Sequence, residues 1–203
     1  INTDEYDNIK SVVNDYLKEG IAHTLDETRN LSDSGQFEDI SLQQGIRQIL
    51  YPYEEMEVLN PEWEVILKDI IDSLFEQMSD EEYNILNEEF GTYMVSRAYE
   101  YRQLLEYFVF RYFAKSIYDY DFLGKCQMLV TNFFVIRQMD IIRWLDNHRE
   151  YSFKDRMDVV HIFSRQVEYS EDNIENLYED FIFDDIFKTD SLIAILWIDS
   201  ENI

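Results

Sequence analysis

Hydrophobic residues recur along much of the chain at the spacing of an amphipathic helix. The clearest stripe lies between residues 61 and 75, where charged side chains fill the opposite face. Its apolar members are Trp63, Ile66, Leu67, Ile70, Ile71, Leu74 and Phe75. Asn60 and Pro61 stand where a helix N-terminus favours a capping oxygen and a residue without N–H. Ser79 with Glu82 predicts a capping box, and Ser170 predicts the start of a later helix.

Two long segments in the middle of the chain, 99–118 and 122–145, are apolar on nearly every face. Such helices are expected where other helices surround them. The short link at 119–121 makes them antiparallel neighbours. Their rings predict core packing rather than a cofactor site: Phe108, Phe110, Tyr112, Phe113, Phe133 and Phe134. We therefore predict an all-α fold, a compact array of about seven to nine helices around a central antiparallel pair, with a helical solenoid as the alternative.

The beginning of the chain has a different pattern. A stripe of apolar residues from Tyr6 to Leu17 ends at Gly20, and a polar stretch without a period follows. We predict a helix plus a polar loop over 1–40 and a helical core domain over 41–203, with one domain overall as the alternative. Because the first residue is Ile rather than Met, we expect a processed chain or an excised piece of a longer protein.

Charge and cysteine content exclude several classes of function. The chain has 43 Asp and Glu residues against 17 Lys and Arg residues, a formal net charge of -26. This charge disfavours nucleic acid and anionic lipid and favours a basic partner. The single cysteine, Cys126, rules out an internal disulfide and a Cys-rich metal site, and indicates a reducing, cytoplasmic setting. The longest apolar stretch, Phe133 to Ile142, is interrupted by Arg137 and Asp140, so we predict no membrane span.

Familiar catalytic motifs are missing from the sequence. The five glycines are isolated, so no glycine-rich turn can hold a phosphate or a dinucleotide. His23, His148 and His161 have no partner at metal-ligand spacing, and we predict no metal site. Cys126 has no nearby His to activate it. The chain therefore shows no complete catalytic site of its own.

Several segments nevertheless resemble the carboxy-terminal half of the flagellin lysine-N-methylase family. The first is Leu105-Glu106-Tyr107-Phe108-Val109-Phe110-Arg111-Tyr112-Phe113-Ala114-Lys115, continued by Tyr118-Asp119 and Asp121-Phe122-Leu123-Gly124. Ile136-Arg137 and Ile142-Arg143-Trp144 come next. The stretch Ser164-Arg165-Gln166-Val167-Glu168-Tyr169-Ser170, with Asn173, is similar to the family's "Ser-Arg-x-Val-Glu-His-Ser" motif. Tyr169 stands where the family commonly has His. The similarity covers about 99–178, by the span of these motifs.

The resemblance implies a function that spacing alone does not. Members of that family transfer methyl groups from S-adenosylmethionine to lysines of flagellin, and they carry a cysteine-rich amino-terminal half that looks like an iron–sulfur module. It implies that this chain is the helical domain of a bacterial, cytoplasmic protein-lysine N-methyltransferase, incomplete without an upstream iron–sulfur segment. The partner would be flagellin or another lysine-rich protein. A non-catalytic acidic adaptor and a self-associating scaffold are the alternatives.

Ionisable residues inside the apolar helices are the candidate site. They form either a buried polar network or a pocket, and the set is Tyr107, Arg111, Tyr112, Lys115, Tyr118, Asp119, Arg137, Arg143, Ser164, Arg165, Glu168 and Asn173. Removal of charges from water costs several kcal/mol each unless they pair. We predict pairs of Arg111 or Arg165 with Glu168, and of Arg137 with Asp140. The alternative is a pocket whose basic groups bind the carboxylate of S-adenosylmethionine, with tyrosine rings facing its sulfonium.

Overall fold

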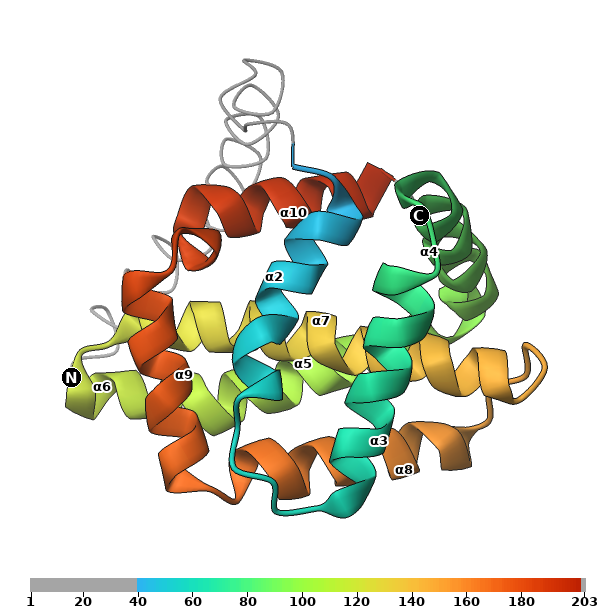
Figure 1. The fold of residues 1–203 in the computed structure, drawn as a ribbon. Helices are drawn as coiled ribbons and strands as arrows, with labels where there is room; N and C mark the ends of the chain where they lie inside the picture. Colours follow the sequence, from blue (N-terminus) through green and yellow to red (C-terminus); the bar gives the residue numbers. More distant parts are fainter. Residues whose placement is uncertain (1–39, 202–203) are drawn as a thin grey trace, which may run out of the picture. The chain divides into compact units, whose positions relative to one another are not determined.

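The computed structural model of the protein describes residues 40–201, and in that range every regular element is a helix (Figure 1). The α-helices are α2 (Leu42–Glu54), α3 (Pro61–Ile70), α4 (Asp80–Met94), α5 (Ala98–Tyr112), α6 (Ser116–Asp119), α7 (Phe122–Asp146), α8 (Phe153–Phe163), α9 (Glu171–Phe183) and α10 (Thr189–Glu201). The predicted all-α array is confirmed. The predicted helix and loop over 1–40 lie almost wholly outside the described residues, so that division of the chain stays a prediction.

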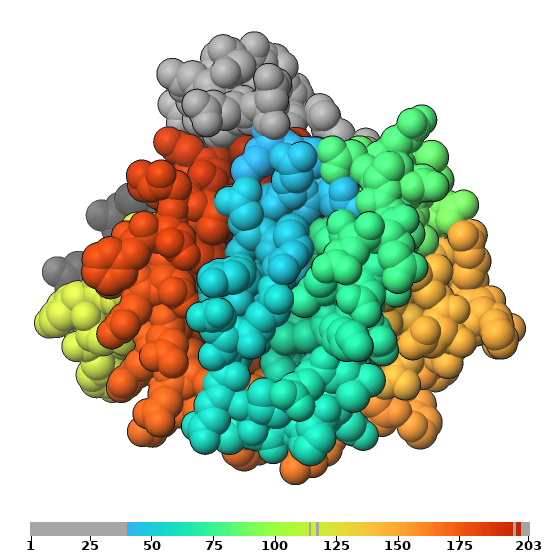
Figure 2. Space-filling view, in the orientation of Figure 1, coloured from blue at the N-terminus to red at the C-terminus, as the bar shows by residue number. Residues whose placement is uncertain are grey.

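The helices form two crossing layers. α5, α7 and α8 run side by side in one layer, with α5 antiparallel to α7 as predicted, and α9, α2 and α3 cross them in front (Figure 1). α10 runs across one end and contacts α2 and α7. Figure 2 shows α2 as a band between α9 and α10 on one side and α3 and α4 on the other. Because α7 touches helices of both layers, most of its faces are buried.

The helices begin at the residues that the sequence indicates. The Asn60 side chain accepts a hydrogen bond from the Glu62 N–H at 3.2 Å, directly before Pro61. Ser79 and Glu82 form the predicted capping box. The Ser170 hydroxyl accepts from the Asn173 N–H at 3.1 Å and starts α9. Each cap satisfies amides that have no partner within the helix, which fixes where the helix starts.

The core lies where the two layers meet. Phe108 of α5 and Trp63 of α3 both pack on Phe163 of α8, with ring centroids 6.3 and 6.2 Å apart. Phe134 is also fully buried, as predicted. The prediction that Phe110 packs in the core is wrong, because its side chain is 79% exposed. A residue two positions from Phe108 points to the opposite side of a helix, and in α5 that side faces away from α7.

The predicted single helix over 99–118 is also wrong. α5 ends at Tyr112, and a 3-10 turn over Phe113–Lys115 follows. α6 ends at Asp119 and is capped by Tyr120, whose φ of 59° is left-handed. A 3-10 turn has three residues rather than 3.6, so the faces of the two helices are out of phase. Arg111, Lys115 and Asp119 therefore do not share one stripe. The break places the Phe113 ring against Phe122, with centroids 5.2 Å apart.

Two segments widen into π-helix, Ile71–Glu76 after α3 and Ser164–Glu168 after α8. The Gln43 side chain of α2 donates to the carbonyl oxygens of Leu74 and Met78, at 2.6 and 2.9 Å. This amide satisfies carbonyls at the end of the first π segment. π turns occur often at functional sites, which draws attention to the second segment and its buried Glu168.

Candidate functional site

A buried carboxylate, Glu168, lies at the end of the second π segment. Its side chain is 4% exposed and receives hydrogen bonds from the hydroxyls of Tyr112 at 2.9 Å and Tyr107 at 3.1 Å. The Arg111 guanidinium lies 3.8 Å away, which brings together the predicted pair of Arg111 and Glu168. We call these four residues the Glu168 cluster. It joins the end of α5 to the π segment.

The Glu168 cluster is a hydrogen-bonded set of donors around one acceptor. Burial raises the pKa of Tyr107 and of Tyr112, and the negative charge of Glu168 raises both further. Both phenols therefore stay protonated at neutral pH and keep donating to the carboxylate. The Glu168 carboxylate, which accepts both hydrogen bonds, is therefore better suited to orient or bind a cation than to remove a proton.

A second polar group lies deeper, between α2 and α7. The Tyr53 hydroxyl donates to Asn132 Oδ1 at 2.8 Å and lies 3.1 Å from the Thr131 hydroxyl. Asn132 is fully buried, and its Nδ2 has no hydrogen-bond partner among residues 40–201. Burial raises the pKa of Tyr53 above the usual tyrosine range. This interior amide thus uses its oxygen but not its nitrogen, which is uncommon for a buried polar group.

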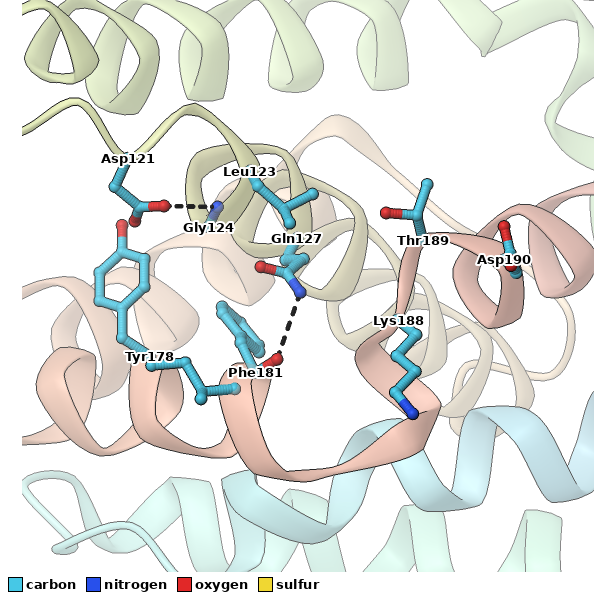
Figure 3. A pocket seen from close by; sticks show the side chains of 10 residues that line it. Asp121, Leu123, Gly124, Gln127, Tyr178, Phe181, Lys188, Thr189 and Asp190 are labelled. Carbon is cyan, nitrogen blue, oxygen red and sulfur yellow. Dashed lines mark hydrogen bonds between the residues drawn. The ribbon is translucent and has the colours of Figure 1, made fainter.

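A pocket lies where the start of α7 meets the end of α9 and the start of α10 (Figure 3). Its volume is about 530 Å³, within the range of ligand sites. It is lined by Asp121, Leu123, Gly124, Gln127, Tyr178, Phe181, Ile182, Lys188, Thr189 and Asp190. In Figure 3, Asp121 and Tyr178 lie at one end and Lys188 and Asp190 at the other, with Gln127 between them. We call this the α7–α9–α10 pocket.

Asp121 is held at the pocket by the backbone of α7. Its carboxylate accepts a hydrogen bond from the Gly124 N–H at 2.9 Å and caps the helix. A Cβ at residue 124 would lie 2.2 Å from a carboxylate oxygen of Asp121, so only glycine leaves room for this cap. The sequence Asp121-Phe122-Leu123-Gly124 thus has a physical reason: it starts α7 and points a carboxylate at the pocket.

Gln127 is held just as firmly, one turn further along α7. Its Nε2 donates to the carbonyl oxygens of Phe187 at 2.9 Å and Phe181 at 3.3 Å, and the residue is 7% exposed. In Figure 3 the amide nitrogen points to Phe181, and the oxygen points the other way, into the pocket. The two carbonyls therefore fix the side chain so that an acceptor faces the cavity.

An ammonium group already lies beside this pocket. Lys125 Nζ is 3.0 Å from Asp119, 3.5 Å from Asp121 and 4.3 Å from the centre of the Tyr178 ring. The hydrogen bond from the backbone N–H of Asp121 lowers the pKa of Asp119, and the hydrogen bond from Lys125 lowers it further. Carboxylates and an aromatic face are the groups that bind ammonium ions in proteins.

Comparison with known proteins identifies the family of this chain. The model of the family described as "FliB lysine N-methylase C-terminal domain" matches residues 1–195. The chain belongs to this family. The match includes the Glu168 cluster and the α7–α9–α10 pocket. Searches of curated proteins and of solved structures gave no match.

In this member of the lysine N-methylase family, other predicted charges pair differently. The predicted pair of Arg137 and Asp140 is wrong. Arg137 Nη2 lies 3.0 Å from Asn87 Oδ1 of α4 and 3.6 Å from Asp199 of α10. Asp140 faces α8 in its own layer, where it pairs with Arg156. Each residue has a partner on a neighbouring helix, so the two do not pair along α7.

The Asp140 site is a structural network that the sequence did not reveal. Asp140 accepts hydrogen bonds from Tyr101 at 2.7 Å and from Tyr151, and Arg156 also lies 3.3 Å from Glu100. Burial raises the pKa of Asp140, whereas Arg156 and the two tyrosines act in the opposite direction. The network ties α5, α7 and α8 together. The one sequence signal for it is that charged residues recur inside apolar helices.

The remaining predicted residues do not gather at one place. Asn173 is buried, and its side chain binds the Glu57 N–H and C=O and the Gln166 C=O, so it holds the loop before α3. Ser164 begins the π segment, Asp119 pairs with Lys125, and Arg143 lines a shallow groove between α3, α7 and α8. Three of the predicted residues are exposed and form no ion pair with residues 40–201: Lys115, Tyr118 and Arg165. The predicted alternative pair of Arg165 and Glu168 is not formed.

The cysteine content of this chain does not fit an iron–sulfur cluster. Iron–sulfur clusters are commonly held by four cysteine thiolates, and the sequence has one cysteine. Burial raises the pKa of that Cys126 thiol, which opposes the thiolate form. Across 40–201, no group of three or more His, Cys, Asp or Glu side chains lies together to bind a metal ion. In the same range, no helix has the length and apolar character needed to cross a membrane.

Proposed function

We propose that this chain is the helical domain of a protein-lysine N-methyltransferase that uses S-adenosylmethionine and modifies flagellin. The observation that carries the proposal is the family match, which covers residues 1–195 of 203. The net charge of -26 supports a lysine-rich substrate, because long-range attraction speeds encounter with a basic protein.

Within this proposal the domain binds the protein substrate, and a cysteine-rich segment upstream would hold the iron–sulfur cluster. The single cysteine of this chain is consistent with that division of labour. We assign no reaction step to the cluster or to the methyl donor. The chain's own contribution is to place a lysine side chain near carboxylates and aromatic rings, which bind an ammonium group.

Methyl transfer tests the proposal directly. The full-length protein, purified with its cluster reconstituted, is incubated with flagellin and S-adenosylmethionine labelled on the methyl group. We expect label in flagellin lysines and none in flagellin whose lysines have been acetylated beforehand. Absence of label with the reconstituted protein would contradict the proposal.

An acidic adaptor is the second candidate function. It is favoured by the polar clusters around Glu168 and Asp140, in which side chains satisfy one another rather than converge on an open cavity. An adaptor binds flagellin with the same salt dependence and transfers no methyl group. Binding without labelling in the experiment above therefore identifies it.

A further inference from the structure

We infer that the α7–α9–α10 pocket accepts a lysine side chain of the substrate protein, and that the apolar residues at its mouth are the surface on which that protein docks. The inference rests on the proposed function and gives it a location. The family match does not assign a role to any residue of this pocket.

The interior of the pocket presents an unused acceptor. Gln127 is 7% exposed, both protons of its amide group point to backbone carbonyls, and no residue among 40–201 donates to its Oε1. This oxygen is not one of the fully buried polar atoms without a partner, so solvent reaches it from the pocket, and a ligand that supplies N–H groups can take the place of that solvent. An ammonium group has three donors and no acceptor, which suits this oxygen.

The charges around the pocket leave an excess of carboxylates. Lys125 is shared by Asp119 and Asp121, and Lys188 pairs with Asp185. Asp190, at the other end of the pocket, has no ion pair within the described part of the chain. Asp119, Asp121 and Asp190 thus have only the charge of Lys125 to balance them. A further cation that enters lowers this repulsion and also meets the Tyr178 ring.

The mouth of the pocket is unusually apolar for a surface with this net charge. Leu123 is 54% exposed and Ile182 is 75% exposed, and both line the pocket. Their neighbours in the chain, Phe122 and Phe183, are 61% and 80% exposed. Grouped exposed aromatic and aliphatic residues mark protein interfaces more often than sites for small polar ligands. We call Leu123 and Ile182, the two that line the pocket, the apolar rim.

A lysine within a protein segment matches both parts of the site. Its aliphatic stem can lie along Leu123, Phe181 and Ile182 while its ammonium reaches Gln127 and Asp121, in the way that lysine stems commonly cover apolar surface. Residues next to that lysine then cover the apolar rim. An arginine would present a planar fork that needs a bidentate acceptor, whereas a single fixed amide oxygen suits an ammonium.

Binding of flagellin to variants of the full-length protein tests the inference. Asp121→Asn removes one charge and keeps the helix cap, because Asn caps as well as Asp. Leu123→Ser and Ile182→Ser each remove exposed apolar surface. The matched controls are Glu81→Gln and Ile85→Ser, both at exposed positions of α4. Thermal melts of each variant establish that the fold is intact.

We expect the pocket and rim variants to weaken flagellin binding about tenfold each, which is about 1.4 kcal/mol, and the α4 controls to bind as wild type. Acetylation of the flagellin lysines should lower wild-type affinity by a similar factor and make Asp121→Asn indistinguishable from wild type. Equal affinity of all variants overturns the inference, and so does equal weakening by the α4 controls.

Two further measurements separate this inference from the proposed function. If the pocket variants lose affinity for labelled S-adenosylmethionine but keep affinity for flagellin, the pocket belongs to the methyl donor and the inference is overturned. If the wild-type protein binds flagellin through the pocket but transfers no methyl group, the inference stands and the proposed enzymatic function fails. If methyl transfer is unchanged in every pocket variant at limiting flagellin, the function stands and the inference fails.

Discussion

At the scale of single residues, each buried charge in α7 has its partner on another helix. Arg137 has a side chain 4% exposed and lies between Asn87 and Asp199, and Asp140 is fully buried beside Arg156. Removal of a charge from water is offset only when a partner and further hydrogen bonds are present. These residues therefore fix how α7 packs against α4, α8 and α10.

Replacement of Arg137 by Met tests this role. The change leaves the Asp199 carboxylate, 7% exposed, without a cation, and we expect the free energy of unfolding to fall by about 3 to 5 kcal/mol. Chemical denaturation of the two proteins measures the difference. The exposed Arg165→Met variant serves as the control and should change stability by less than about 0.5 kcal/mol. A loss below about 1 kcal/mol for Arg137→Met would show that Asp199 finds another partner or water.

Residues that act locally could be predicted from the sequence, and residues that act at a distance could not. Asn60, Ser79 and Ser170 accept hydrogen bonds from amides two or three residues ahead. The local sequence is therefore enough to predict these caps. Arg137 finds Asp199 only after α7 and α10 have packed. Which side of a nearly all-apolar helix faces which neighbour is set by tertiary packing, and no local pattern encodes it.

At the scale of elements, the central pair was predictable but its faces were not. α5 and α7 are antiparallel neighbours because a short link joins them. α5 carries apolar residues on nearly every face, but only one face is buried in the fold. Phe108 is buried and Phe110 is exposed. The break after Tyr112 escaped prediction because the residues that follow have no proline or glycine to mark it.

The exposed and buried rings of these two helices should differ sharply in their effect on stability. Phe134→Ala removes a fully buried ring, and we expect a loss of about 3 to 5 kcal/mol. Phe110→Ala removes a ring that is 79% exposed, and we expect a change within about 0.5 kcal/mol. Urea denaturation of both variants gives the comparison. Similar losses for the two would mean that the exposed face of α5 is covered in solution.

At the scale of the whole molecule, negative charge is the dominant property. The excess of 26 carboxylates over basic residues is a property of composition, and it was evident without a structure. The location of the α7–α9–α10 pocket was not evident, because α7 lies apart from α9 and α10 in the sequence and meets them only in the fold. The sequence supplied only Asp121-Phe122-Leu123-Gly124 and Tyr178, within the stretch that resembles the family.

The charge predicts how binding to flagellin responds to salt. Exposed opposite charges are screened over about 8 Å at physiological ionic strength, so affinity should fall steeply as salt is added, mainly through a slower association rate. Titration of flagellin at several salt concentrations measures the slope. An affinity that does not change with salt would indicate that the acidic surface only keeps the protein in solution.

The second π segment lets the helix hold an extra residue without changing the direction of Glu168. A π turn closes its hydrogen bonds at i+5 rather than i+4, so Ser164–Glu168 holds one residue more than an α-helix would need. Deletion of one residue before Glu168 within this segment would let α8 continue as an ordinary α-helix. Because the wider turn had already absorbed that residue, Glu168 would still point toward Tyr112. A relative that is one residue shorter at this place can therefore keep the cluster, so a gap of one residue in an alignment carries less meaning here than a substitution of Glu168.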